Sequence, residues 1–300
     1  MKRDRSWTWQ PIAATRLDFT GLKIAVIGGT GGIGRALSRH LAAHGANVVV
    51  VGQTFRDSDL SGISFIKADL SLMQEARRVG ASLPAETLDL VIFTTGIMAG
   101  PTREQTLDGI ERDVAISYLS RFVMLNEIGP RLGKGRTEAS TKPRVFVMGF
   151  PGSNQLGKPD DLNSETSYSR WTAHMNTVAG NEALVLDAAA RYPQAAFFGL
   201  NPGFVKTGIR SNLFGPKMVL RIVEWMTGFM TSSPESYAER IAPLLISPDI
   251  EGHSGAMFNN KGEPILPSSK LTNRIVSKIM AASETLAARA KVQVAPFRLP

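Results

Sequence analysis

The sequence of 300 residues contains no cysteine. Disulfides, thiolate metal sites, iron–sulfur clusters and thiol nucleophiles are therefore excluded, so redox chemistry would need a bound cofactor, and we expect no metal site. The longest apolar runs fall far below the ~18 to 20 residues that span a bilayer. Residues 1–11 also lack the apolar stretch of a secretory signal. These absences predict a cytoplasmic protein with no membrane span.

Charge is unevenly distributed along the chain. The net charge of +8 divides into an excess of three positive charges in residues 1–16 and five in residues 270–300, so residues between them are neutral overall. A nucleic-acid site needs basic residues clustered on one folded face with stacking aromatics. We therefore expect no nucleic-acid partner. The chain divides into a basic, solvated N-terminal extension (1–17), one folded domain (18–269) and a basic helical C-terminal extension (270–300) with an amphipathic helix at 271–290.

Short, continuously apolar segments alternate with helix-length segments from residue 22 onward. A strand that is apolar along its whole length is covered on both faces, which is typical of parallel sheets flanked by helices. The pattern predicts an α/β fold of the Rossmann type: a doubly wound, mainly parallel, seven-stranded sheet with helices on both faces. We expect strands at 23–27, 47–51, 63–67, 88–93, 144–148, 195–200 and 256–259, and helices at 32–43, 72–79, 104–132, 170–191 and 234–245.

A glycine-rich turn joins the first expected strand to the first expected helix. Residues 28–34 read Gly-Gly-Thr-Gly-Gly-Ile-Gly and contain both the GxGxxG and the GxxxGxG spacing. Glycines permit a tight turn and a close approach of the backbone to a pyrophosphate, which the helix N-terminus then faces. The turn predicts a dinucleotide site formed by Gly28, Thr30, Gly31, Gly32, Ile33 and Gly34.

Together with four later segments, this turn resembles the short-chain dehydrogenase/reductase family over residues 18–262. Residues 88–98 are similar to the family's strand ending in Asn-Ala-Gly, and residues 108–111 to the start of its long interface helix. Residues 201–207 resemble its Pro-Gly turn beside the nicotinamide, and residues 254–258 its last strand. The interrupted apolar segment 211–230 is interpreted as a lid over the substrate cleft. The resemblance implies an NAD(P)(H)-binding protein.

The end of the second expected strand bears on the choice of cofactor. A carboxylate there binds the ribose of NAD and repels the 2′-phosphate of NADP, but this chain has Gly52 at that position. Arg56 could pair with a phosphate and Thr54 could hydrogen-bond it, so NADP(H) is favoured over NAD(H). Against this, Gln53 stands where many NADP-using relatives carry Arg, and Arg56 could be a solvated loop residue. The resemblance implies further cofactor contacts from Asp69, Leu70, Thr94, Thr95, Gly96, Pro202, Gly203, Val205 and Thr207.

The family's catalytic Tyr, followed four residues later by a Lys, occurs at none of the four tyrosines of this chain. In one register of the expected helix at 170–191, His174 stands at the Tyr position and Val178 at the Lys position. A shift of two residues would place Thr172 and Asn176 there instead. The family's Ser position falls within 149–150, where neither residue is a serine.

Other side chains could supply the proton chemistry. His174 is the first candidate, because an imidazole titrates near neutrality. An apolar neighbour at Val178 disfavours the charged ring, so we expect His174 to act as a base, although a purely structural role is equally open. Ser117 occupies the family's Asn position, and Tyr168 and Ser153 are further candidate donors, with packing near the cleft the alternative for Tyr168.

Two functions remain open. The first is an oxidoreductase that acts on a small carbonyl or alcohol compound with atypical catalytic residues. The alternative is a non-redox enzyme, such as a cyclase or isomerase, or a cofactor-sensing binding protein on the same scaffold. The resemblance also implies a homodimer or homotetramer through the helices expected at 104–132 and 170–191, whose apolar side chains exceed what one sheet face covers: Val114, Tyr118, Leu119, Phe122, Val178 and Leu184.

Overall fold

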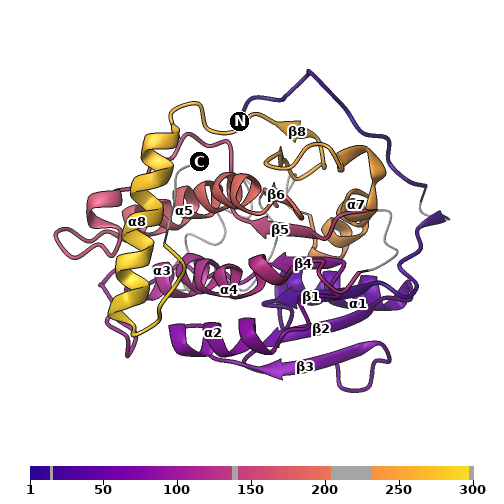
Figure 1. The fold of residues 1–300 in the computed structure, drawn as a ribbon, viewed down its shortest axis with the longest axis horizontal. Coiled ribbons are helices and arrows are strands. Elements are labelled where there is room, and N and C mark those ends of the chain that lie inside the picture. Colours follow the sequence, from indigo (N-terminus) through magenta and orange to yellow (C-terminus); the bar gives the residue numbers. More distant parts are fainter. Residues whose placement is uncertain (14–15, 137–140, 204–231, 297–300) are drawn as a thin grey trace, which may run out of the picture.

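The computed structural model describes residues 1–13, 16–136, 141–203 and 232–296. Their core is one sheet in the order β3-β2-β1-β4-β5-β6-β7-β8, in which the first seven strands are parallel and β8 pairs antiparallel with β7 (Figure 1). The α/β fold expected from the sequence is confirmed, with eight strands in place of seven. The strands are β1 Lys23–Ile27, β2 Asn47–Gly52, β3 Ile63–Lys67, β4 Leu90–Phe93, β5 Arg144–Met148, β6 Ala196–Leu200, β7 Met257–Phe258 and β8 Pro264–Ile265.

Helices cover both faces of the sheet. On one face α1 (Gly32–Ala43) and α7 (Pro234–Ile246) pack together against one apolar core. On the other face α2 (Met73–Ser82), α4 (Ser120–Ile128) and α5 (Arg170–Arg191) enclose a second core. Local signals set the starts of α5 and α7: the hydroxyls of Ser169 and Ser233 accept the backbone N–H of Thr172 and Ser236.

The helix expected at 104–132 begins later than predicted. A short α3 (Arg112–Val114), a π-helical turn η2 (Ala115–Leu119) and α4 follow one another without a break. Residues before them form a turn in which Gly109 has a φ of +73°, and the carboxylate of Glu111 caps α3 by accepting the N–H of Val114. Hence residues 104–111 lie outside the helix.

The sequence predicted that the helices at 104–132 and 170–191 carry more apolar side chains than one sheet face covers, and this prediction is wrong. The six side chains in question are all less than 5% exposed within the single chain: Val114, Tyr118, Leu119, Phe122, Val178 and Leu184. The C-terminal helix α8 (Asn273–Arg289) crosses α5 and η2 and covers them, and its Ser283 hydroxyl lies 2.6 Å from the hydroxyl of Tyr118 (Figure 1). These side chains therefore give no reason of their own to expect subunits to pair through these helices, and the pairing that the resemblance implies stays a prediction.

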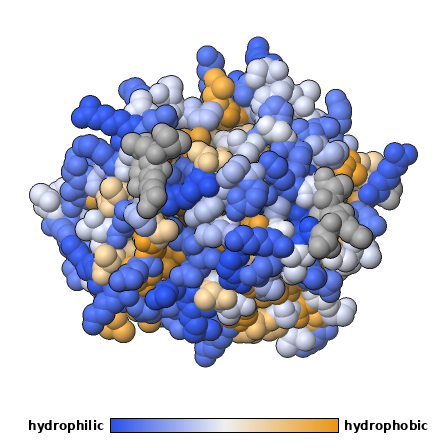
Figure 2. Space-filling model, viewed as in Figure 1, coloured by the Kyte–Doolittle hydropathy of each residue, from blue (hydrophilic) through white to orange (hydrophobic). Residues whose placement is uncertain are grey.

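The N-terminal residues also pack on the body of the protein. Trp9 is 8% exposed and its indole N–H donates to the carbonyl of Gly262 at 2.6 Å, while Trp7 stacks on His253. The segment thus packs on the body through its tryptophans, while its basic residues Lys2, Arg3 and Arg5 are exposed. The face seen in Figure 2 is mostly hydrophilic, with hydrophobic residues in scattered groups. Within the described ranges, none of the helices has the length and apolar character needed to cross a bilayer.

Candidate active site

A cleft of about 820 Å³ opens at the carboxyl ends of the parallel strands. Its walls come from the loops that follow β1 to β5, from α5, and from the first residues after β6. This edge is where open α/β sheets bind ligands. The expected cofactor residues that line it are Gly28, Thr30, Gly31, Gly32, Ile33, Gly34, Gln53, Asp69, Leu70, Thr94, Thr95, Gly96, Pro202 and Gly203.

The glycine turn leaves room for an anion before α1. Gly31 is the N-cap of α1 and offers no capping side chain, and a Cβ built on it has no protein atom within 4 Å. The first turn of α1 carries no acidic side chain, so its free backbone N–H groups face the cleft with nothing to repel a phosphate. Gly34 allows close packing instead, because a Cβ there would lie 2.4 Å from the carbonyl oxygen of Gly28. These features fit a dinucleotide pyrophosphate.

The loop after β2 differs from the prediction in its details. Thr54 and Arg56 are exposed and do not line the cleft, whereas Gln53 does and donates to Asp69 at 3.0 Å. A Cβ at Gly52 would lie 2.7 Å from Cγ2 of Thr30, so a carboxylate side chain there would require the Thr30 side chain to move. Val205, Thr207 and the expected lid at 211–230 lie outside the described residues.

Two arginines of α1 that contact the loop after β2 were not predicted. Arg35, in the first turn of α1, holds the buried carboxylate of Asp57 through two hydrogen bonds of 2.8 and 2.7 Å. Arg39 reaches the same carboxylate at 3.1 Å. The hydrogen bond from Arg35 is the main reason that the pKa of Asp57 lies below its usual value. Two cations therefore face one anion beside the second strand.

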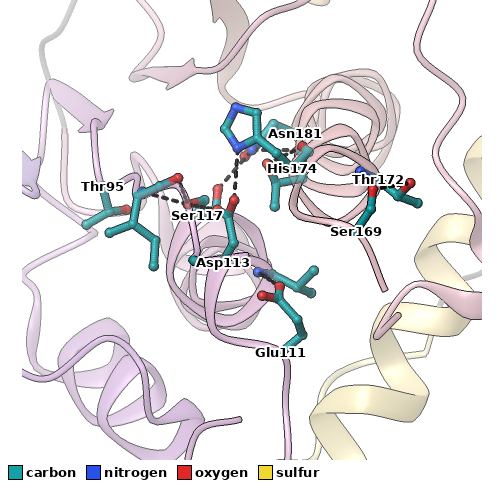
Figure 3. A network of polar contacts seen from close by, with 12 residues as sticks. Thr95, Glu111, Asp113, Ser117, Ser169, Thr172, His174 and Asn181 are labelled. Atoms are coloured by element: carbon teal, nitrogen blue, oxygen red, sulfur yellow. Dashed lines mark hydrogen bonds and ion pairs between the residues drawn. The ribbon is translucent and has the colours of Figure 1, made fainter. Parts of the chain in front are cut away.

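At the other end of the cleft, His174 on α5 meets Asp113 on α3. The imidazole Nδ1 lies 2.9 Å from Oδ2 of Asp113, a side chain with no solvent exposure, and the other ring nitrogen points away from Asp113 (Figure 3). The second carboxylate oxygen of Asp113 accepts the hydroxyl of Ser117 at 2.6 Å. Since a carboxylate accepts hydrogen bonds, Nδ1 carries the proton of the neutral ring and Nε2 is the basic nitrogen. The arrangement can take up or release a proton at Nε2.

The predicted apolar surroundings of His174 are therefore incomplete. Val178 lines the cleft as expected, but the direct partner of the ring is a carboxylate, which attracts a positive charge on the imidazole. The two-residue shift finds no support in the geometry: Asn176 is fully buried and donates to the backbone of Leu162, away from the cleft.

A second set of polar contacts lies next to the pair formed by His174 and Asp113. The amide of Asn181 on α5 donates to the backbone oxygen of Ser117 at 2.9 Å and accepts a hydrogen bond of 2.9 Å from Arg121 on α4. Arg121 also donates to the carbonyl oxygens of Thr95, two residues beyond the end of β4, and of Met148, the last residue of β5. The loops after these strands and one face of α5 are thereby fixed to one another.

The other candidate donors lie outside the cleft. The hydroxyl of Tyr168 donates to the carbonyl of Gly100 at 2.8 Å, and that of Ser153 to the carbonyl of Phe150 at 2.8 Å; neither side chain is among the residues lining the cleft. Thr172 takes part in the N-terminal cap of α5. Of the predicted donors, the structure brings His174 and Ser117 together, through Asp113.

Comparison with known proteins places this cleft in a family. The model of the short chain dehydrogenase family matches residues 23–138. A Saccharomyces cerevisiae protein named "Uncharacterized oxidoreductase YKL107W" is 50% identical over 99% of this chain and 97% of its own. The chain belongs to the short chain dehydrogenase family.

More distant relatives agree with that membership. Human retinol dehydrogenase 14 is 25% identical, over 89% of this chain and 86% of its own length. A solved structure of a Mycobacterium paratuberculosis protein shares the fold at a TM-score of 0.67 and 21% identity, over 96% of this chain and 100% of that one. Another, a putative NAD(P)-dependent gluconate 5-dehydrogenase from Beutenbergia cavernae with bound NADP, gives a TM-score of 0.62 at 19% identity, over 82% and 97% of the two chains. This short chain dehydrogenase is thus an NAD(P)-dependent oxidoreductase by family.

Sequence reasoning missed Asp113, Arg121 and Asn181. A signal was present, because residues 113, 117 and 121 follow one another at intervals of four, and such spacing places side chains along one face of a helix. Polar side chains repeated on one helical face inside an otherwise apolar segment indicate a site.

Proposed function

We propose that this chain interconverts an apolar carbonyl compound and its alcohol with NADP(H), and that His174 is the acid and base of the reaction. The observation that carries the proposal is the contact between His174 and the buried carboxylate of Asp113 at the wall of the cofactor cleft. A His held in this way can exchange a proton with a substrate oxygen within ~2.6 to 3.2 Å or through one water.

The reaction balances with a bound nicotinamide, which exchanges the hydride, and with His174, which exchanges the proton. When bound, the nicotinamide supplies or accepts the hydride, which is one hydrogen with two electrons. In the oxidation direction, the carbinol carbon loses that hydride, the C–O bond becomes a double bond, and the hydroxyl proton moves to Nε2 of His174. In the reduction direction the imidazolium returns the proton to the carbonyl oxygen as the hydride reaches the carbon. Asp113 stabilises the imidazolium in both directions, because its carboxylate contacts Nδ1 at 2.9 Å.

The preference for NADP(H) is supported by charge. Arg35 and Arg39 on α1 together exceed the single charge of Asp57, so a positive excess lies beside the loop after β2, although neither arginine is among the residues that line the cleft. Gly52 also stands where an NAD-selective enzyme would carry a carboxylate, so no negative charge at that position repels a 2′-phosphate. A 2′-phosphate bound beside the end of β2 would be attracted by this positive excess.

The substrate class follows from the wall opposite the glycine turn. Around His174 the lining side chains are mostly apolar: Met98, Ile116, Phe150, Trp171, Met175 and Val178. Trp171 is 58% exposed at this wall, an apolar surface available to a ligand. Relatives named retinol dehydrogenase 14 and polyprenol dehydrogenase match at 24 to 25% identity, and their names refer to apolar alcohols.

The test has two stages. Purified protein is titrated with NADPH and NADH, and then assayed with aldehydes and ketones of increasing apolar chain length. His174→Ala is expected to lower turnover of the best substrate at least ~100-fold, at nearly unchanged cofactor affinity. His44→Ala is the matched control, because His44 lies at the C-terminal end of α1 and does not line the cleft.

Two results would contradict the proposal in different ways. A His174→Ala variant with full activity would show that another group moves the proton. Cofactor binding without turnover of any carbonyl or alcohol would favour a cofactor-sensing protein.

A further inference from the structure

Trp171 lies at the open end of the cleft wall that α5 forms. Exposure falls along this wall: Trp171 is 58% exposed, the side chain of His174 is 29% exposed, and Val178 is 4% exposed. The cleft therefore opens at the N-terminal end of α5 and closes towards Val178. The residues of α5 that line the cleft are spaced three and four apart, which places them on one face of the helix: Trp171, His174, Met175, Thr177, Val178 and Asn181.

The exposed indole is part of a larger apolar surface. In the described part of the chain, five large hydrophobic side chains are exposed, and Trp171 is the one among them that lines the cleft; the five are Met1, Leu60, Leu107, Trp171 and Leu266. Met98, Phe150 and Met175 line the same cleft. An exposed aromatic ring that belongs to an apolar cleft wall indicates a surface that a ligand covers.

The backbone that carries the indole is already ordered. The hydroxyl of Ser169 caps the first turn of α5, to which Trp171 belongs. The hydroxyl of Tyr168 donates to the carbonyl oxygen of Gly100 at 2.8 Å, and this bond ties the start of α5 to the loop after β4. A support that is fixed in advance loses little conformational entropy when a ligand binds to it.

We propose that Trp171 is a specificity-determining residue that binds the apolar chain of the substrate where the chain leaves the cleft. The inference rests on the function proposed above, in which the reacting oxygen contacts Nε2 of His174. Trp171 precedes His174 by three residues, a rise of ~4.5 Å along the helix axis. A chain that runs from His174 to the opening therefore passes the indole, whereas a chain that ends beside His174 does not reach it.

The proposed position of the chain predicts how activity depends on its length. Each methylene group that leaves water contributes about fourfold to a binding or specificity constant. We therefore expect the kcat/KM of the wild type for reduction with NADPH to rise from propanal through hexanal to octanal. Because the cleft is open at Trp171, a longer chain extends into solvent, and kcat/KM for decanal should be no lower than for octanal.

Variants at Trp171 test the contact directly. In Trp171→Ala the ratio of kcat/KM for decanal to that for propanal is expected to fall at least ~10-fold, mainly through a higher KM for decanal. Trp171→Phe keeps an aromatic ring and is expected to retain most of the ratio. Leu107→Ala is the control, because Leu107 is 94% exposed and does not line the cleft. Damage to the position of His174 would lower both activities together and leave their ratio unchanged.

The fluorescence of the indole gives a readout that needs no turnover. An indole emits at shorter wavelength when water leaves its surface. Titration of decanol into the wild type is therefore expected to shift the emission to shorter wavelength, and this shift should be absent in Trp171→Phe.

The possible outcomes separate this inference from the proposed function. Equal kcat/KM for propanal and decanal in the wild type, or a Trp171→Ala variant that keeps the wild-type ratio, would overturn the inference. A fall in kcat/KM between octanal and decanal would show a closed wall in place of the open end and would also overturn it. If no aldehyde or alcohol is turned over, the proposed function fails, and the decanol titration still shows whether Trp171 binds an apolar chain.

Discussion

The imidazole Nδ1 of His174 lies 2.9 Å from the buried Oδ2 of Asp113, although the two residues are 61 positions apart in the sequence. The contact joins α5 to α3 and determines which ring nitrogen is free for chemistry. Asp113 is held in turn by the hydroxyl of Ser117 at 2.6 Å, so its carboxylate cannot rotate to another partner without losing a buried hydrogen bond.

Asp113→Asn tests this relationship. The amide preserves the shape but can present an N–H to Nδ1, which favours the tautomer with its proton on Nε2 and leaves a developing imidazolium without its counter-ion. We expect kcat to fall at least ~10-fold, with cofactor affinity changed less than about twofold. Asp160→Asn, at an exposed position in the loop before α5, is the control. Unchanged kcat in Asp113→Asn would mean that the carboxylate has no part in the proton transfer.

The glycine turn is best tested at Gly31. A side chain there points into open space and not into the protein, since no atom lies within 4 Å of its Cβ position, and the φ of −157° suits any residue. Gly31→Val is therefore expected to fold and to weaken NADPH binding at least ~10-fold by filling the pyrophosphate site. Gly252→Val is its match, because a Cβ at Gly252 also meets nothing within 4 Å and lies outside the cleft lining. Equal NADPH affinities in the two variants would refute the site.

Gly34 is a less suitable position for this test. A Cβ at Gly34 would lie 2.3 Å from the hydroxyl of Thr94 and 2.4 Å from the backbone oxygen of Gly28. A larger residue at Gly34 would therefore disturb the packing of α1 on the sheet, and lost binding could not be distinguished from lost structure.

Cofactor selectivity depends on the balance between Arg35 and Asp57. Removing the guanidinium in Arg35→Ala leaves a buried carboxylate opposed only by Arg39, so the loop loses its positive excess. The ratio of NADPH to NADH affinity is expected to fall about tenfold, an effect of one unit charge in a partly screened site. Arg56→Ala gives the comparison, since Arg56 is exposed in the loop itself, and no hydrogen bond or ion pair joins it to Asp57 among the described contacts. A larger loss of selectivity in Arg56→Ala would restore the prediction made from the sequence.

The oligomeric state should reflect the position of α8. Because Tyr118 and its apolar neighbours are covered by α8, the face that the sequence assigned to a second subunit is already buried. Light scattering at micromolar concentration is expected to give the mass of one chain, 32.4 kDa. Twice that mass would show that the subunits do pair, as the family resemblance implies.

Much of the fold was readable in the sequence because its signals are local. The bounds of α1 and α5 match the prediction, since a glycine turn and a serine cap mark their starts. The helix predicted at 104–132 was placed too early, because the cap at Glu111 and the turn at Gly109 become visible only with the backbone in place.

The site was less predictable, for a physical reason. His174 and Ser117 were identified from the family pattern. Asp113 and Arg121 were not, because their roles depend on contacts between elements that are far apart in the sequence: Asp113 contacts His174 on α5, and Arg121 contacts Asn181 on α5 and the backbone of Thr95 after β4. Such contacts depend on how helices dock, which a single sequence does not encode in any short motif. For the same reason, the sequence did not show that the hydroxyl of Tyr168 donates to the backbone oxygen of Gly100.

Glu111 provides a test of the electrostatics around Asp113. Its side chain is fully buried, Oε2 accepts the N–H of Val114, and Oε1 has no hydrogen-bond partner among the described atoms. Burial raises the pKa of Glu111 above its usual value, and the nearby charge of Asp113 acts in the same direction. The folded state therefore holds the proton more tightly than the unfolded chain does. The resulting stabilisation is complete below the unfolded pKa of ~4.3 and is lost as the pH rises through the folded value.

Glu111→Gln removes this dependence while keeping an oxygen that can accept the N–H of Val114. The melting temperature of Glu111→Gln relative to that of the wild type is therefore expected to rise from pH 5 to pH 8. The reason is that only the wild type must bury a charge as the pH rises. Glu104→Gln is the control, because Glu104 is exposed and pairs with Arg112, and its difference should stay constant over the same range. Thermal unfolding in a pH series measures both. A Glu111→Gln difference that is constant or falls with pH would mean that the buried carboxyl is ionised in the folded protein at no cost, and that Oε1 has a partner in solution.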